Sequence, residues 1–162
     1  MLPEDLSKIP ATQKARQKKF LQKLKQKKYK DLDQQFQDCH DEVFAEFDCL
    51  TCANCCKTIS PIFKSRDIDR ISKVLRMSRN EFIDNYLRLD EDHDYVLRKT
   101  PCPFLEEGNL CSIYEFRPEA CAEYPHTNSR RAYQLLGLTE KNVTVCQAAF
   151  LIVEKLQEKY PS

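Results

Sequence analysis

Glycine is nearly absent from this sequence: Gly108 and Gly137 are the two glycines among 162 residues. Phosphate-binding loops such as Walker A, and the dinucleotide-binding GxGxxG motif, need several closely spaced glycines. The GxSxG turn that carries the nucleophile of many serine hydrolases needs two. The sequence therefore excludes these nucleotide-binding and hydrolase motifs, and no other catalytic motif is visible in it.

Long apolar runs are also missing. No stretch approaches the roughly 20 apolar residues that span a bilayer, so we predict no transmembrane segment. The first ten residues, MLPEDLSKIP, carry acids where a signal peptide has positive charge, and no apolar stretch follows. We therefore expect a cytoplasmic protein, in a compartment where thiols stay reduced.

Acidic residues are absent between Lys8 and Lys30, where ten basic residues occur. Subtracting these ten charges from the net charge of +1 leaves −9 for the remainder of the chain. The sequence thus predicts two domains, a basic helical arm over residues 1–47 and a cysteine-cluster metal-binding domain over residues 48–162.

The basic arm has several candidate partners: nucleic acid, an anionic membrane surface or an acidic protein. Alternatively, its apolar stripe, which includes Phe20 and Leu24, docks on the body and leaves the lysines in solvent. Phe20 and Tyr29 are the aromatic residues interleaved with the charges, a thin platform for stacking on bases. We therefore favour docking over nucleic-acid binding.

Hydrophobic periodicity predicts a mainly α-helical fold with a short hairpin. Residues 11–47 are rich in good helix formers and show no turn signal, so we expect one long helix there. Ser78 and Glu81 form a capping box at the start of a later helix, and Thr139 is expected to cap a final helix. A strand over residues 95–99, a hairpin-like loop around Glu107–Asn109 and a short helix that begins at Pro118 are also expected.

Cysteine is abundant, with nine residues. Four of them form a CxxCxxCC run and four more follow downstream; together these eight are our predicted metal ligands: Cys49, Cys52, Cys55, Cys56, Cys102, Cys111, Cys121 and Cys146. Thiolates at such spacings are strong ligands for zinc and for iron–sulfur clusters. Disulfides, redox thiols and plain packing are the alternatives, and in a reducing compartment ligation is the more typical use.

The eight thiols allow two four-thiolate sites or one site with spare cysteines. Because neighbouring side chains diverge, Cys55 and Cys56 are candidates for different centres. Cys39 lies apart from the run, in the predicted long helix, and we interpret it as a packing residue. His126 is a further candidate ligand, although a lone histidine more often hydrogen-bonds a neighbour, and His40 and His93, which lie among acids, are expected to be exposed.

Three segments carry a resemblance: CLTCANCC, DIDRISKVLRMSRNEFIDNYL and YVLRKTPCPFLEEGNLCSIYEFRPEACAEYP. In order and spacing they resemble the YkgJ-type cysteine-cluster family, described as a zinc- or iron-chelating domain. The resemblance covers roughly residues 47–125 and extends toward Cys146. Ala53 stands where the family usually has glycine, and Ala122 and Tyr124 replace the more usual arginine and phenylalanine. A related cysteine domain occurs in flagellin lysine methylases, where an iron–sulfur cluster is the expected cofactor.

The choice between iron and zinc stays open at this point. The CxxCxxC spacing and Pro103 directly after Cys102 favour an iron–sulfur cluster, specifically [4Fe–4S]. Structural zinc accepts any tetrahedral set of four thiolates and is the alternative. We predict a metal-binding accessory protein with a candidate protein partner; the alternative is an enzyme whose metal centre takes part in redox or protein-modification chemistry.

Overall fold

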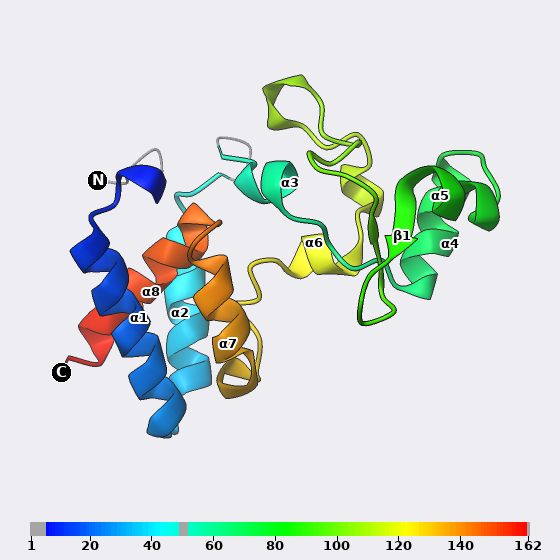
Figure 1. Ribbon diagram of the computed structural model, residues 1–162. Helices are drawn as coiled ribbons and strands as arrows, with labels where there is room; N and C mark the ends of the chain where they lie inside the picture. Colours follow the sequence, from blue (N-terminus) through cyan, green and yellow to red (C-terminus); the bar gives the residue numbers. More distant parts are fainter. Residues whose placement is uncertain (1–5, 49–51, 162) are drawn as a thin grey trace. The chain divides into compact units, whose positions relative to one another are not determined.

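The computed structural model describes residues 6–48 and 52–161, and its architecture is mainly α-helical with one short antiparallel hairpin, as predicted. The chain divides into two compact units (Figure 1). We call Met1–Cys52 with Pro125–Ser162 the terminal unit, and Ala53–Tyr124 the cysteine unit. No helix in the described part of the chain is long and apolar enough to cross a membrane.

The terminal unit is built from four helices that lie side by side (Figure 1): α1 (Ala11–Gln26), α2 (Leu32–Phe44), α7 (Ala132–Asn142) and α8 (Gln147–Lys159). A short 3₁₀ turn, Leu6–Lys8, precedes α1. The helices contribute fully buried apolar side chains to one core, among them Leu21, Leu24, Phe36, Leu136, Ile152 and Leu156. The N-terminal and C-terminal segments therefore share one core, so these packing units differ from the predicted domains 1–47 and 48–162, which stay a prediction.

The predicted single helix over residues 11–47 is wrong, because the backbone leaves helical geometry after Gln26 and resumes it at Leu32. Contacts from distant residues hold this break. The Tyr133 hydroxyl donates to the Lys27 carbonyl at 2.7 Å and accepts from the Tyr29 amide. The Tyr160 hydroxyl donates to the carboxylate of Asp31 at 2.7 Å. The sequence gives no local turn signal at this break, because the contacts that stabilise it come from Tyr133 of α7 and from Tyr160.

The single C-terminal helix predicted from Thr139 is also wrong, since two helices occupy this region. Thr139 lies inside α7, where its hydroxyl donates to the Leu135 carbonyl at 3.0 Å. Helix α8 begins only after Cys146, whose sulfur accepts from the Ala149 amide at 3.4 Å. A sulfur cap of this kind has no strong sequence signature.

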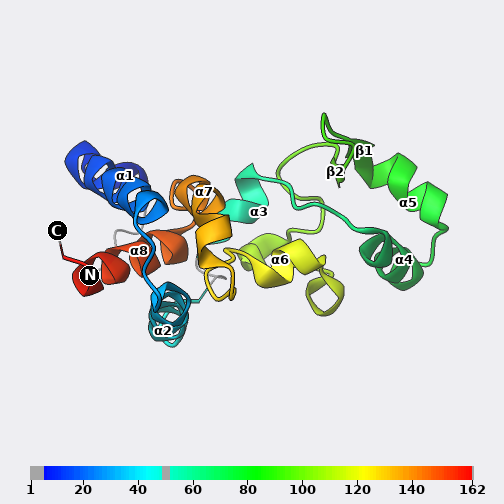
Figure 2. The same ribbon diagram turned by 90° about the horizontal axis from the view of Figure 1, so that it is seen from below.

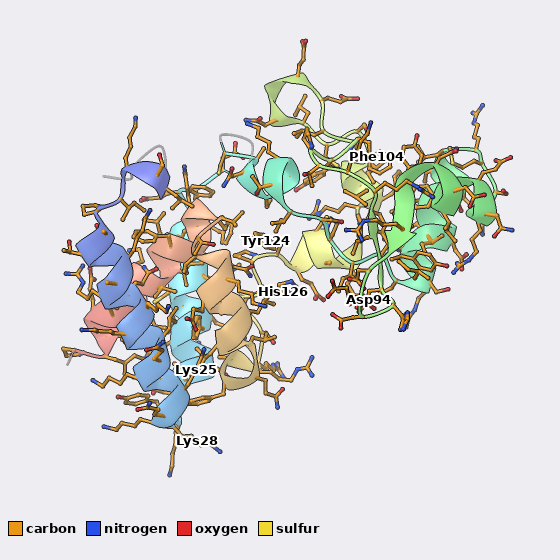
Figure 3. All side chains as sticks on the ribbon, viewed as in Figure 1. Lys25, Lys28, Asp94, Phe104, Tyr124 and His126 are labelled. Atoms are coloured by element: carbon orange, nitrogen blue, oxygen red, sulfur yellow. The ribbon has the colours of Figure 1, made fainter. Side chains whose placement is uncertain are left out.

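Helix α1 packs through its apolar side, as the docking interpretation predicted: Phe20 is 8% exposed and Leu24 fully buried. Two basic residues of α1 find their acidic partners on α7 and α8. Lys25 contacts Glu140 at 2.6 Å and Arg16 contacts Glu154 at 3.6 Å. Figure 3 shows Lys25 near the C-terminal end of α1 and Lys28 just beyond it.

The cysteine unit contains α3 (Asn54–Thr58), α4 (Ser65–Val74), α5 (Arg79–Tyr86), β1 (Leu87–Leu89), β2 (Tyr95–Leu97) and α6 (Glu119–Glu123). Ser78 and Glu81 form the predicted capping box at the start of α5. The two strands pair in antiparallel register, with Arg88 opposite Val96, and pack beside α5 (Figure 2). A core of eight buried apolar residues lies between these elements: Phe63, Ile68, Ile71, Phe82, Leu87, Leu97, Phe104 and Ile113.

Replacing Leu24 by alanine tests whether α1 is part of the terminal core. We expect the free energy of unfolding in urea to fall by about 2–5 kcal/mol, because a fully buried leucine is truncated. The exposed Lys19→Ala on the same helix is the control, with an expected change within about 0.5 kcal/mol. Equal effects of the two variants would contradict a docked α1.

Candidate metal centre

The CxxCxxCC run leads into the short helix α3, which carries Cys55 and Cys56. Ala53, directly before this helix, has φ +47° and ψ 20°, in the left-handed region. Glycine adopts this conformation without the steric cost that a Cβ imposes. The backbone of this turn therefore explains why glycine is usual at this position in the family that the sequence resembles. Alanine forms the same turn under strain.

Substituting Ala53 by glycine should stabilise the protein. Removing the Cβ relieves a left-handed residue, an effect of about 1 kcal/mol in the free energy of unfolding. Ala122→Gly, in helix α6, is the matched control and should destabilise by up to about 1 kcal/mol, because glycine weakens a regular helix. Urea titration measures both, and a destabilised Ala53→Gly protein would contradict the strained turn.

Cys102 and Cys111 lie on opposite arms of a narrow loop, near the place where the sequence predicted a hairpin. The arms are joined by an isolated bridge between Leu105 and Cys111 and by a hydrogen bond from the Ser112 amide to the Phe104 carbonyl, 2.8 Å. The tip reverses at Gly108, with φ +74°. Phe104, labelled in Figure 3, lies on the first arm of this loop and is buried in the core. Both cysteines are half-buried and pack against that core.

Cys121 lies on α6, the short helix that Pro118 begins, as the sequence predicted. Its amide donates to the Pro118 carbonyl at 2.9 Å, which closes the first turn of the helix. The Cys121 thiol is thus carried by a third backbone segment, separate from α3 and from the 102–111 loop.

Backbone contact and charge link these three segments. The Cys102 amide donates to the Cys56 carbonyl at 2.8 Å, so α3 and the 102–111 loop touch directly. Burial and, after it, the nearby charges of three other thiols, those of Cys56, Cys102 and Cys111, raise the pKa of Cys121. These four thiols therefore share one neighbourhood within the cysteine unit. Within residues 6–48 and 52–161, no three His, Cys, Asp or Glu side chains are already placed to hold a metal ion.

The acidity of the four thiols is uneven. Burial raises the pKa of Cys121 from 9.0 to about 12, and burial also raises the pKa of Cys102 and of Cys111. Nearby thiolate charge, including that of Cys56, adds to all three shifts. The pKa of Cys56 is instead lowered to about 7, chiefly because the Cys55 side chain hydrogen-bonds to it. The group thus contains one readily ionised thiol and three that stay protonated near neutral pH.

The other predicted ligands have different surroundings. Cys49 lies outside the described residues. Cys52 is half-buried at the boundary of the terminal unit, and Cys55 contacts Cys56. Cys146 is buried in the terminal unit as the cap of α8. None of the cysteines in the described part of the chain forms a disulfide, and the full eight-ligand set stays a prediction.

Cys39 is fully buried in α2, which confirms its interpretation as a packing residue. His93 is exposed, as expected, but the expectation for His40 is wrong. The His40 ring is half-buried and hydrogen-bonds through Nδ1 to the Thr127 hydroxyl at 2.7 Å, and burial lowers its pKa. His126 is half-buried in the terminal unit with φ +64°.

A family model described as CxxCxxCC, putative zinc- or iron-chelating domain, matches residues 48–147. The chain belongs to this family. The match confirms the cysteine-cluster resemblance of the sequence and supports a metal, zinc or iron, as the bound partner of this CxxCxxCC domain. Searches of curated proteins and of solved structures find no match.

The uneven acidity of the thiols in the CxxCxxCC domain gives a test that depends on pH. Metals bind thiolates, so each protonated ligand releases its proton on loading. With the Cys56 pKa about 7 and the other three raised above 9.0, zinc loading should release about three protons at pH 8 and about four at pH 6.

Isothermal titration calorimetry with zinc, in buffers of different ionisation enthalpy, measures the number of protons released. Because metal binding releases protons, the affinity for zinc should rise steeply between pH 6 and pH 8. Release of fewer than two protons at both pH values would contradict ligation by this set of thiols.

Proposed function

We propose that the cysteine unit holds one metal centre through the thiolates of Cys56, Cys102, Cys111 and Cys121. The observation that carries this proposal is the shared neighbourhood of four thiols delivered by three separate segments. Plain packing would not require cysteine at four neighbouring positions. A cation, in contrast, compensates the charge that these buried thiols resist carrying.

Metal binding at this place would connect parts of the unit that few other interactions join. The apolar core packs α4, α5 and the strands, whereas α3 and α6 are helices of five residues each without a fully buried side chain. Helices this short are not stable alone. A metal bound to α3, α6 and the 102–111 loop would therefore contribute to folding directly.

Four thiolates suit either a [4Fe–4S] cluster or a tetrahedral zinc ion. We favour the iron–sulfur cluster, on the CxxCxxC spacing of the sequence. The remaining predicted ligands, Cys49, Cys52, Cys55 and Cys146, stay predictions outside this four-thiol set. We assign the protein a cytoplasmic accessory role, in which it provides a metal centre to a protein partner.

Anaerobic purification with metal and sulfide analysis tests this function. For the cluster we expect iron and acid-labile sulfide in equal amounts and a broad visible absorption. For zinc we expect a colourless protein in which X-ray absorption shows four sulfurs at about 2.3 Å. A protein that binds neither metal after reconstitution would contradict the proposal.

Replacing Cys102 or Cys121 by serine should remove the metal. Loss of a structural metal site can cost roughly 10 kcal/mol of folding free energy in a small domain, so the cysteine unit should also lose helical structure. Metal content and circular dichroism report the two effects. Cys39→Ala is the control and should retain full metal content, since Cys39 lies in the core of the terminal unit.

The same assay examines the wider ligand set. The eight-cysteine prediction expects Cys52→Ser to lower the metal content too. Unchanged content in Cys52→Ser, together with loss in Cys121→Ser, would restrict the ligands to the four-thiol centre. Full metal content in both Cys102→Ser and Cys121→Ser would contradict the centre itself.

A further inference from the structure

We propose that Asp67 and Arg70 of α4 are positioning residues for the metal centre: together they hold the start of α6 and thereby place the thiol of Cys121. This inference rests on the proposed function of the cysteine unit. Neither residue is a candidate ligand.

Asp67 is 2% exposed, and its carboxylate accepts hydrogen bonds from two separate backbone segments. One oxygen accepts from the Lys64 amide at 2.9 Å, at the beginning of α4. The other accepts from the Glu119 amide at 3.2 Å, at the beginning of α6. The first backbone amides of a helix have no hydrogen-bond acceptor within the helix. The Asp67 carboxylate supplies an acceptor to one such amide at the start of α4 and to another at the start of α6. It therefore fixes the two helix starts relative to each other.

Arg70 completes the arrangement from the next turn of α4. Its guanidinium lies 2.9 Å from the Asp67 carboxylate and donates to the Arg117 carbonyl, also at 2.9 Å. The Asp67–Arg70 pair thus bonds to the carbonyl before Pro118 and to the amide after it. Both contacts come from the same nitrogen, Nη2, which carries two hydrogens and so can donate to two acceptors.

Cys111 and Cys121 lie on either side of the segment around Pro118 that Asp67 and Arg70 bind. Cys121 follows in the first turn of α6, where its amide bonds to the Pro118 carbonyl. On the other side, the 3₁₀ turn Tyr114–Phe116 is bonded to Cys111, whose carbonyl accepts from the Tyr114 amide at 3.2 Å. The Asp67–Arg70 pair therefore links the α4 scaffold to the segment that separates two proposed ligands.

Stability alone is a poor reason for this pair. The Asp67 carboxylate loses hydration on burial, and the Arg70 side chain is 40% exposed, so solvent screens the attraction between them. The second link across the same place, between Lys64 and Glu119 at 2.9 Å, is exposed, and such pairs contribute little. Asp67 and Arg70 instead orient the start of α6, which carries Cys121, and a metal ligand must be oriented toward the metal.

Asp67→Asn and Arg70→Gln test the proposal in the metal-loaded full-length protein. Asparagine keeps the shape of the side chain but weakens its bonds to Arg70 and the two helix starts. Arg70→Gln leaves the buried carboxylate and its backbone bonds in place and removes the bridge to Arg117, so one variant remains informative if the other folds poorly. We expect zinc affinity to fall about 10- to 100-fold in each.

Alkylation of single cysteines, followed by mass spectrometry, separates positioning from general loosening. In both variants Cys121 should react faster than in the wild type, while Cys102 and the far-UV circular dichroism change little. Asp69→Asn is the matched control: Asp69 is on the same helix and contacts Arg79 at 2.7 Å, but this exposed pair joins α4 to α5. It should leave affinity and Cys121 reactivity unchanged.

Two outcomes would overturn the inference. One is wild-type zinc affinity and an unchanged Cys121 reaction rate in both variants. The other is an equal rise in reactivity at Cys102 and Cys121, which marks general loosening. Failure of the metal-binding function itself is distinguishable, because the wild-type protein would then bind no metal.

Discussion

The hydrogen bond from the Cys102 amide to the Cys56 carbonyl joins two segments that are far apart in the sequence. It brings the short helix α3 against a loop that the apolar core already holds in place through Phe104 and Ile113. Helix α3 has no fully buried side chain of its own, so this backbone contact is one of the few interactions that position it. The neighbourhood of the four thiols follows from this connection.

That neighbourhood creates an electrostatic problem which a metal would solve. Cys102, Cys111 and Cys121 are buried enough that each resists ionisation, and the ionised Cys56 nearby increases the resistance. Without a cation these three thiols stay protonated near neutral pH, and no attraction draws their sulfurs to one point. Binding of a metal would exchange protons for charge compensation and tie the three segments together.

Local sequence signals predicted the elements that depend on local interactions. The capping box at Ser78 and the helix after Pro118 are confirmed, because each needs only residues within one turn. The mainly α-helical class and the family followed from periodicity and from the cysteine spacing. The break after Gln26 was missed because it is held by tyrosines from distant segments, one of them Tyr133.

The candidate site shows the same division. The cysteine spacing predicted a metal-binding domain, which the family match supports, whereas the set of ligand cysteines stays a prediction. It could not show which cysteines share a neighbourhood, because that depends on contacts such as the one between Cys56 and Cys102. The roles of Asp67 and Arg70 were likewise invisible, since charged residues on a helix are usually on its solvated face. Only the burial of Asp67 and its bond to Glu119 set this pair apart.

Anomalous diffraction from crystals of the metal-loaded protein, recorded at the absorption edge of the bound metal, tests the four-thiolate centre most directly. The account predicts an anomalous peak within bonding distance of the sulfurs of Cys56, Cys102, Cys111 and Cys121. A metal bound in the cysteine unit by other side chains, with these four sulfurs unligated, would contradict it.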